Sequence, residues 1–105
     1  AMGSPGGSRI ITTVTQVLLQ RILWGANLAT AVAAPRIHSQ LWPDRLSLEE
    51  GISPDTRRLL EAMGHSTQPS AAMGAANSVE LLAPLGSGSL GVVDPRRGRT
   101  VAVGE

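Results

Sequence analysis

A glycine pair that leads into an amphipathic segment constrains this chain more than any other feature of its sequence. The pair stands in Ser4-Pro5-Gly6-Gly7-Ser8, and apolar residues then recur three to four positions apart as far as Leu23. That period predicts one helix over residues 8–24, with a broad apolar side. Ser8 is its expected N-cap, because a serine hydroxyl can accept a hydrogen bond from a free amide of the first turn.

The backbone around Gly6 and Gly7 has the properties of an anion site. Pro5 fixes its own φ, whereas glycine adopts backbone conformations that are closed to other residues. A glycine pair at this place directs free N–H groups towards one spot, where the positive end of the helix dipole adds to them. Such a spot suits an anion or a developing oxyanion. The alternative interpretation is a plain turn before a capped helix.

The composition bounds the fold. A chain of 105 residues makes one small domain, which we expect to span residues 1–105. Hydrophobic residues make up 42% of it, but Phe and Tyr are absent and Trp occurs twice, so Leu, Val, Ile and Ala must fill the core. We therefore expect part of the core to come from outside the chain. Residues 1–4 are either native sequence or a remnant of cloning.

Charge and residue usage exclude several functions. The net charge is +1, and nine Arg are interspersed with eight acidic residues, so no basic stripe favours nucleic acid. The absence of Cys excludes disulfides, zinc–thiolate sites and cysteine nucleophiles. No segment reaches the ~18 apolar residues of a membrane-spanning helix.

No motif in the chain predicts a metal or a cofactor. His38 and His65 are far apart in the sequence, and no cluster of acidic residues completes a metal site with them. Ser87 and Ser89 lie among glycines, but no lysine is present and no helix follows, so a phosphate-binding loop is excluded.

The residues after the first helix predict a second helix and two strands. Gly25 can take the left-handed conformation that ends the first helix. Asn27 is then expected to cap a short helix over residues 28–34, which Pro35 ends. Alternating apolar and polar residues predict short strands over 36–41 and 46–49.

Ser53-Pro54-Asp55 is the clearest helix start in the chain. It supplies an N-cap, a proline at the first helical position and an acid in the first turn. The helix is expected to carry Leu59, Leu60 and Met63 inward and to close at Gly64.

The last third of the chain is predicted to form strands. Residues 66–76 are small and polar, which indicates a loop or a weak strand. Residues 77–82 and 89–93 are separated by a turn-rich segment and predict an antiparallel pair, with a last short strand over 100–103. Helices first and strands last indicate an α+β fold, in which the helices cover one face of these strands.

Two charged motifs allow a structural interpretation only. Glu49-Glu50 is predicted to be a solvated pair in a loop, with no partner that would make it a general acid–base dyad. The stretch 94–97 contains Asp94 and Arg96, and either an ion pair fixes the last turn or the stretch is a surface turn of little consequence.

Seven stretches of the sequence match one known family in chain order. They are Pro5-Gly6-Gly7-Ser8-Arg9-Ile10-Ile11-Thr12-Thr13, then Ala31-Val32-Ala33-Ala34-Pro35-Arg36-Ile37-His38 with Gln40, Ser53-Pro54-Asp55-Thr56, Leu59-Leu60-Glu61-Ala62-Met63-Gly64-His65, Met73-Gly74-Ala75-Ala76-Asn77-Ser78, and Gly91-Val92-Val93-Asp94-Pro95-Arg96-Arg97 followed by Ala102-Val103-Gly104. Together they cover nearly the whole chain. In these stretches the sequence resembles the gamma-glutamyltransferases, also called gamma-glutamyl transpeptidases.

The resemblance implies the C-terminal half of the family's small subunit, within the four-layer αββα fold of the N-terminal-nucleophile hydrolases. The family cleaves the γ-glutamyl bond of glutathione and related amides and passes the acyl group to water or to an amino acid. Its glycine pair supplies backbone N–H groups to the oxyanion hole, and this catalytic role carries over to Gly6 and Gly7.

Other parts of the family's machinery have no counterpart in this chain. The family's nucleophile is a threonine freed at the N-terminus of the small subunit by self-cleavage. Thr12, Thr13 and Thr15 lie inside a predicted helix, where the backbone nitrogen is an amide and not a base. The paired serines and the acidic residues that hold the γ-glutamyl group also precede the matched part. We therefore expect the isolated chain to be inactive.

The resemblance also implies partners. They are the large subunit and the N-terminal half of the small subunit, with a glutathione-like γ-glutamyl substrate in the complete enzyme, and the location in bacteria is periplasmic or secreted. The isolated chain is expected to self-associate, because its strands keep one uncovered apolar face, with exposed side chains at Val79, Leu81, Leu90 and Val92. The alternatives are a truncated non-catalytic homologue that acts as a binding or pairing module, and a fragment with no physiological role of its own.

Overall fold

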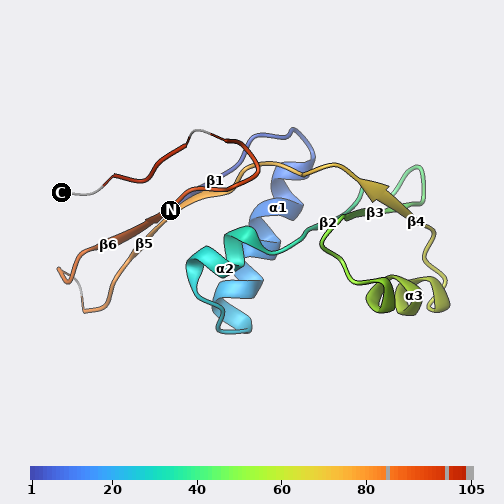
Figure 1. Cartoon of the computed structure of the whole chain (residues 1–105), viewed down its shortest axis with the longest axis horizontal. Coiled ribbons are helices and arrows are strands. Elements are labelled where there is room, and N and C mark those ends of the chain that lie inside the picture. The colour runs from blue at the N-terminus through green and yellow to red at the C-terminus, as the bar shows by residue number, and fades with distance from the viewer. Residues whose placement is uncertain (85, 99, 104–105) are drawn as a thin grey trace. The chain divides into compact units, whose positions relative to one another are not determined.

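The computed structural model of the chain describes residues 1–84, 86–98 and 100–103. Its residues form two compact units. Unit 1 comprises Ala1–Ala34 and the chain from Gly74 onwards, and unit 2 comprises Pro35–Met73. Figure 1 labels the helices and strands, which are described below for each unit by itself.

The helices of unit 1 follow the predicted pattern. Helix α1 spans Arg9–Leu18 and continues directly into the π-helical segment η1, Leu19–Leu23. It ends before Gly25, which has a φ of +70° as expected of a left-handed terminus. Helix α2 spans Leu28–Ala33, and the side chain of Asn27 caps it by accepting the backbone N–H of Thr30 at 2.8 Å. Both predicted helices are therefore confirmed.

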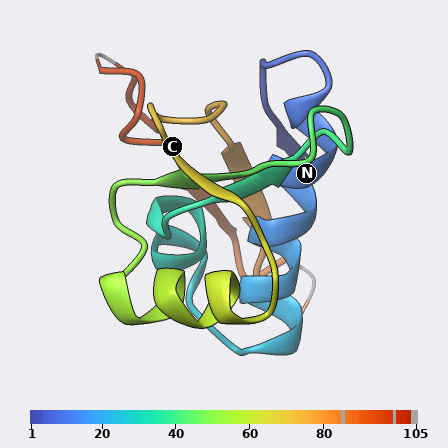
Figure 2. The same cartoon turned by 90° about the vertical axis from the view of Figure 1, so that its right-hand side faces the viewer.

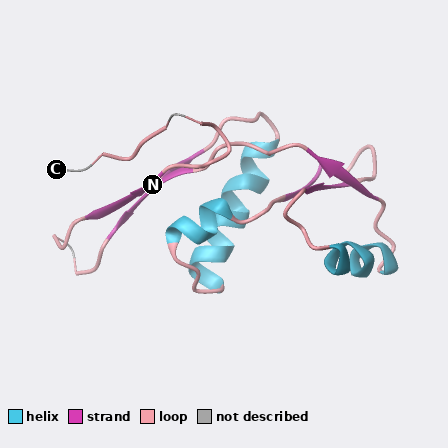
Figure 3. Cartoon of the chain, viewed as in Figure 1, coloured by secondary structure: helices cyan, strands magenta, loops and turns pink. Residues whose placement is uncertain are grey.

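The sheet of unit 1 is antiparallel and has the order β1-β5-β6 (Figure 3). Strand β1 is Met2–Gly3, β5 is Asn77–Leu81 and β6 is Ser89–Val92. The predicted antiparallel pair is confirmed as β5 and β6. Helices and this sheet together give the α+β class that the sequence predicted.

The register of β5 and β6 divides their apolar residues between two faces. Glu80 lies opposite Leu90, and directly opposite residues share a face. Glu80 binds a helix residue and Val92 packs against the core, so Leu90 and Val92 are on the helix side. Successive residues of a strand alternate, so Val79 and Leu81 point to the other face, where the side chain of Leu81 is 69% exposed. The predicted apolar surface is present, but only half of its residues lie on the uncovered face.

The core of unit 1 is small. Its buried members come from both helices and from the residue before β5, and they are Val17, Leu28, Ala31, Val32 and Ala76. Many large apolar side chains stay outside it, among them Ile11 at 73% and Ile22 at 76% exposure. This agrees with the expectation that part of the core comes from elsewhere.

An ion pair links the end of the helix to β5. The Nε and Nη2 atoms of Arg21 donate to the carboxylate of Glu80, with the closest approach at 2.5 Å. These hydrogen bonds, and to a smaller extent the charge of Arg21, lower the pKa of Glu80 against the opposing effect of partial desolvation.

The prediction of a last strand over 100–103 is wrong. These residues are in no strand, although Ala102 lies beside β6, 3.2 Å from the point that a β-carbon on Gly91 would occupy. The chain leaves the sheet before it reaches them, because the N–H of Asp94 is donated to the side chain of Asn77 and that of Arg96 to the side chain of Asp94. Pro95 has no N–H for a ladder.

Unit 2 is a three-stranded sheet with one helix beside it (Figure 2). Strand β2 is Ile37–Ser39, β3 is Leu46–Glu49 and β4 is Thr67–Ser70. The alternation predicted β2 and β3 as strands. In the structure β2 pairs with β3 antiparallel, and β3 pairs with β4 in parallel. The region predicted as a loop or weak strand therefore contains a four-residue strand.

Helix α3, Pro54–Ala62, begins as predicted. The Oγ of Ser53 accepts the backbone N–H of Thr56 at 3.2 Å, and the helix ends ahead of Gly64, whose φ is +97°. The inward placement of Leu59 and Met63 is wrong, since they are 63% and 75% exposed. Nε of Arg57 in α3 donates instead to Oγ1 of Thr67 in β4 at 2.9 Å, and no residue of α3 is buried.

Glu49 is not the solvated residue that its sequence context predicted. It is 7% exposed and belongs to β3, where its carboxylate accepts two backbone N–H groups, from Arg36 at 2.9 Å and from Met73 at 2.5 Å. Glu50 follows β3 in a turn and is exposed.

Within the described ranges, no helix has the length and apolar character needed to cross a membrane.

Candidate functional site

The glycine pair forms a tight turn at the start of α1. Gly6 and Gly7 have φ values of +135° and +59°, conformations that L side chains rarely adopt. The turn brings the carbonyl of Gly6 to the N–H of Arg9 and that of Gly7 to the N–H of Ile10, each at 3.1 Å. Helical hydrogen bonding therefore begins at the glycine pair itself.

The N–H groups of Gly6 and Gly7 remain available. In the part of the chain that the structure describes, neither N–H donates a hydrogen bond, and both glycines are exposed. They precede the first turn of α1, where the helix dipole favours negative charge. Chemically, two such donors suit a carboxylate, a phosphate or the oxyanion of a tetrahedral intermediate.

The predicted capping role of Ser8 is wrong. Ser8 has helical dihedral angles, with φ at −59° and ψ at −22°, and its side chain makes no capping hydrogen bond. An N-cap side chain reaches the first-turn amides from an extended backbone conformation. In this chain the carbonyls of Gly6 and Gly7 have already taken two of those amides.

A second segment, residues 74–76, supports the glycine-pair turn. The Oγ of Ser4 donates to the carbonyl of Pro5 at 2.9 Å and accepts the backbone N–H of Ala75 at 3.0 Å. Sequence reasoning missed this contact because the partners lie 71 positions apart. The only local signal was Gly74, a glycine in a run of small residues, which has a φ of +68°.

An ion pair fixes the far end of that segment. Asp94 is fully buried and accepts the N–H of Ala76 at 2.7 Å. Its other oxygen accepts from Nη1 of Arg96 at 3.2 Å, and Arg96 also donates to the last carbonyls of α2, at 2.9 Å to Val32 and 2.7 Å to Ala34. Of the two interpretations of residues 94–97, the ion pair that fixes the turn is confirmed.

The threonines of α1 do not have the surroundings of an activated nucleophile. The hydroxyl of Thr12 donates to the carbonyl of Arg9 at 3.1 Å, inside the helix, and Thr13 is 1% exposed. Among the described residues, no three His, Asp or Glu side chains form a group that could hold a metal ion. His38 is buried and its Nε2 lies 2.9 Å from Oε1 of Gln40.

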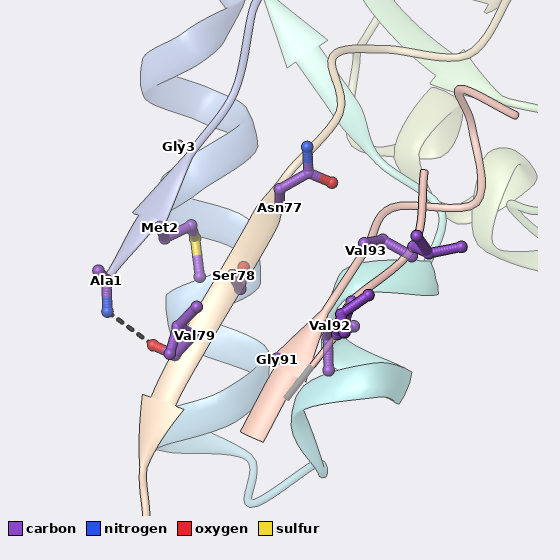
Figure 4. A pocket seen from close by; sticks show the side chains of 12 residues that line it. Ala1, Met2, Gly3, Asn77, Ser78, Val79, Gly91, Val92 and Val93 are labelled. Atoms are coloured by element: carbon purple, nitrogen blue, oxygen red, sulfur yellow. Dashed lines mark hydrogen bonds between the residues drawn. The ribbon is translucent and has the colours of Figure 1, made fainter. Parts of the chain in front are cut away.

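A pocket of about 490 Å³ lies elsewhere in unit 1, along β1, β5 and β6 (Figure 4). The terminal amino group of Ala1 donates to the carbonyl of Val79 there at 2.7 Å. Apart from that amino group, its lining residues carry no titratable group, and neither Gly6 nor Gly7 is among them. The pocket therefore offers no side chain for acid–base chemistry.

Comparison with known proteins identifies relatives of the whole chain. A sequence model of the gamma-glutamyltranspeptidase family matches residues 1–104. The glutathione hydrolase proenzyme of Escherichia coli (strain K12) is 50% identical over 94 residues, which are 90% of this chain and 16% of that protein. The proenzyme of Pseudomonas sp. (strain A14) is 38% identical over 114 residues, 98% of this chain and 19% of that protein. The chain thus spans less than a fifth of these curated relatives.

Solved structures show the same likeness. A mutant gamma-glutamyltranspeptidase of Helicobacter pylori matches with a TM-score of 0.84 and 43% identity, over 91% of this chain and 53% of that chain. An acivicin-inhibited gamma-glutamyltranspeptidase matches with a TM-score of 0.85 and 42% identity, over 93% and 53%. The predicted resemblance and the predicted N-terminal-nucleophile hydrolase fold are confirmed.

Proposed function

The chain belongs to the gamma-glutamyltranspeptidase family, and we propose that it supplies oxyanion-binding backbone amides to an enzyme that cleaves γ-glutamyl amides such as glutathione. Its relatives from Escherichia coli and Pseudomonas are glutathione hydrolase proenzymes. The observation that carries the proposal is the turn at Gly6 and Gly7, whose exposed N–H groups are free of other acceptors in the described chain.

The chemistry of acyl transfer explains what these amides do. Attack on the γ-glutamyl carbonyl makes its oxygen an alkoxide, and two N–H groups held in place stabilise that charge more than they stabilise the neutral substrate. The donors come from the backbone, so no side-chain rotamer has to be ordered during the reaction. A preorganised donor of this kind is worth about 3–4 kcal/mol of transition-state stabilisation.

The remaining machinery belongs to the rest of the enzyme. The proposed partners of this chain are the large subunit and the N-terminal half of the small subunit, which would provide the threonine nucleophile and the γ-glutamyl pocket. In the acivicin-inhibited gamma-glutamyltranspeptidase, the C-terminus has critical roles in autoprocessing and catalysis. A catalytic contribution from this chain is in keeping with those roles.

The test compares two substitutions of Gly7 in the complete enzyme, meaning this chain together with the remaining sequence of a family proenzyme. Valine is β-branched and does not tolerate the φ of +59°, so Gly7→Val displaces the amide. Asparagine tolerates this conformation, and none of the described residues lies within 4 Å of its β-carbon. We expect Gly7→Val to lower kcat by about 10²–10³ with little change in KM, and Gly7→Asn to lose much less.

Rates are expressed per mole of nucleophile titrated with a covalent γ-glutamyl inhibitor, which removes misfolded or uncleaved enzyme from the comparison. Ser8→Ala is the matched control, because its side chain makes no hydrogen bond in the turn. A Gly7→Val enzyme with near-normal kcat would show that the glycine pair is only a turn.

A further inference from the structure

The hydroxyl of Ser4 lies between the glycine-pair turn and a segment 71 positions away. It accepts the N–H of Ala75 at 3.0 Å and donates its own hydrogen to the carbonyl of Pro5 at 2.9 Å. Ser4 is half-buried, and its bond with Ala75 is partly buried, whereas its bond to Pro5 is exposed. One hydroxyl thus ties the turn to its support.

The bond to Pro5 has a direct consequence for Gly6. The carbonyl of Pro5 and the N–H of Gly6 belong to the same planar peptide group, which is trans in this chain. In a trans peptide these two groups point in opposite directions. When the Ser4 hydroxyl holds the carbonyl, it therefore also sets the direction of the Gly6 N–H.

Gly74 makes this arrangement possible. A β-carbon at Gly74 would lie 2.5 Å from Oγ of Ser4, a distance that real β-carbons essentially never show. It would also lie 3.0 Å from Oγ1 of Thr13, which is tighter than most real contacts. The φ of +68° at Gly74 is also a conformation that L side chains rarely adopt. The Cα of Gly74 in turn lies 3.9 Å from the β-carbon position of Gly6. The turn, α1 and the supporting segment therefore meet at a residue that has to be glycine.

The support is itself fixed. Thr13 is 1% exposed and comes from the buried side of α1, and the N–H of Ala76 is held by the buried carboxylate of Asp94 at 2.7 Å. The segment against which Ser4 rests is thus anchored on both sides, by the helix and by the ion pair. This segment therefore does not shift to restore the contact when Ser4 is displaced.

We propose that Ser4 and Gly74 are positioning residues, which aim the Gly6 and Gly7 amides at the reacting carbonyl. This inference rests on the proposed function, because it assigns the two residues a role through those amides. Ser4 acts by orienting the Pro5–Gly6 peptide, and Gly74 acts by leaving room for the Ser4 hydroxyl against α1.

The experiment measures kcat and KM of the complete enzyme with a γ-glutamyl anilide, per mole of titrated nucleophile. Ser4→Ala removes the hydroxyl, and we expect kcat to fall about 3- to 10-fold with KM within about twofold, because the Gly6 N–H is then less well aimed at the oxyanion that forms in the transition state. Ser4→Thr keeps the hydroxyl and restores most of the loss. Gly74→Ala lowers kcat further, because its methyl group displaces the Ser4 hydroxyl. Ser8→Ala, in the same turn, leaves both parameters unchanged.

A double mutant separates positioning from a general structural effect. If Ser4 acts through the glycine amides, Ser4→Ala adds no further loss to an enzyme that already carries Gly7→Val. Additive losses, or full kcat in Ser4→Ala while Gly7→Val is impaired, would overturn the positioning role and leave the proposed function intact. Full kcat in Gly7→Val would overturn the proposed function, and the positioning role with it.

Discussion

The carboxylate of Glu49 accepts the backbone N–H of Met73 at 2.5 Å, although the two residues are 24 positions apart. Its second oxygen accepts the N–H of Arg36 at 2.9 Å, and Nη1 of Arg36 donates to the carbonyl of Met73 at 2.6 Å. All three residues are buried. The points where the chain enters and leaves unit 2 are therefore held together by one carboxylate and one guanidinium.

We expect Glu49→Gln to loosen this closure. Glutamine has one acceptor oxygen and an NH2 group, so one of the two backbone N–H groups loses its acceptor in a buried place, at a cost of about 1–3 kcal/mol. Hydrogen exchange followed by mass spectrometry of the complete enzyme should show faster exchange in the peptides that contain Arg36 and Met73.

The control is Glu50→Gln, which makes the same chemical change at an exposed neighbour. It should leave exchange in both peptides unchanged. Equal protection in the Glu49 and Glu50 variants would mean that the closure does not depend on the carboxylate.

Arg96 is expected to stabilise unit 1 much more than its neighbour Arg97. Arg96→Met leaves the buried carboxylate of Asp94 without its cation and takes two donors from the last carbonyls of α2. Breaking a buried pair in this way costs about 3–5 kcal/mol. The midpoint of thermal unfolding should fall by several degrees in Arg96→Met. It should stay near that of the parent protein in Arg97→Met, because Arg97 is exposed. Equal midpoints would contradict the anchoring role.

The sequence was most informative where a local rule decides the structure. Asn27 and Ser53 cap α2 and α3 through their own side chains, and Gly25 and Gly64, both with positive φ, follow the ends of η1 and α3. Each of these outcomes depends on residues within one turn of the chain, so a capping or terminus rule was sufficient.

Prediction failed where distant residues decide. Glu49 is buried because Met73 brings its N–H to the carboxylate, and the Ser4 hydroxyl is placed by Ala75. Neither partner is visible from spacing. Leu59 stays exposed for a related reason, since the helical period marks an apolar side but not what covers it.

The pair of Arg21 and Glu80 predicts a dependence of stability on pH. Hydrogen bonds from Arg21 hold the pKa of Glu80 below its ordinary value. A carboxyl whose pKa is lower in the folded state stabilises the fold above its unfolded pKa, and this contribution is lost as the pH falls through the folded pKa. The difference in thermal midpoint between the parent and Glu80→Gln should therefore be positive at neutral pH and shrink in acid.

Arg21→Met provides the control for this titration. In its background Glu80 has lost its partner, so Glu80→Gln should change the midpoint little at any pH. A pH-independent difference in the parent background would contradict the role of the ion pair.

The 105-residue chain alone is expected to hydrolyse no γ-glutamyl anilide above the buffer rate. An oxyanion site without a nucleophile leaves acylation without its covalent route, and the backbone nitrogens of Thr12 and Thr13 are helix amides. The complete enzyme, assayed in parallel, shows that the substrate and conditions are suitable. Turnover by the chain alone that Thr12→Ala or Thr13→Ala abolishes would contradict the prediction.

The apolar groove of unit 1 leads to the last prediction. The groove has a volume of about 550 Å³ and is lined by residues of the helix and of β5, among them Ile22 and Leu81, which are both exposed. Exposed apolar surface beside an open strand edge favours association. We expect the isolated chain to form concentration-dependent oligomers in sedimentation at micromolar concentration. Leu81→Lys should weaken them, whereas Thr15→Lys adds the same charge at an exposed polar position and should not. A monomer that persists at all concentrations would contradict this prediction. It would mean that other residues of the same chain cover the apolar surface.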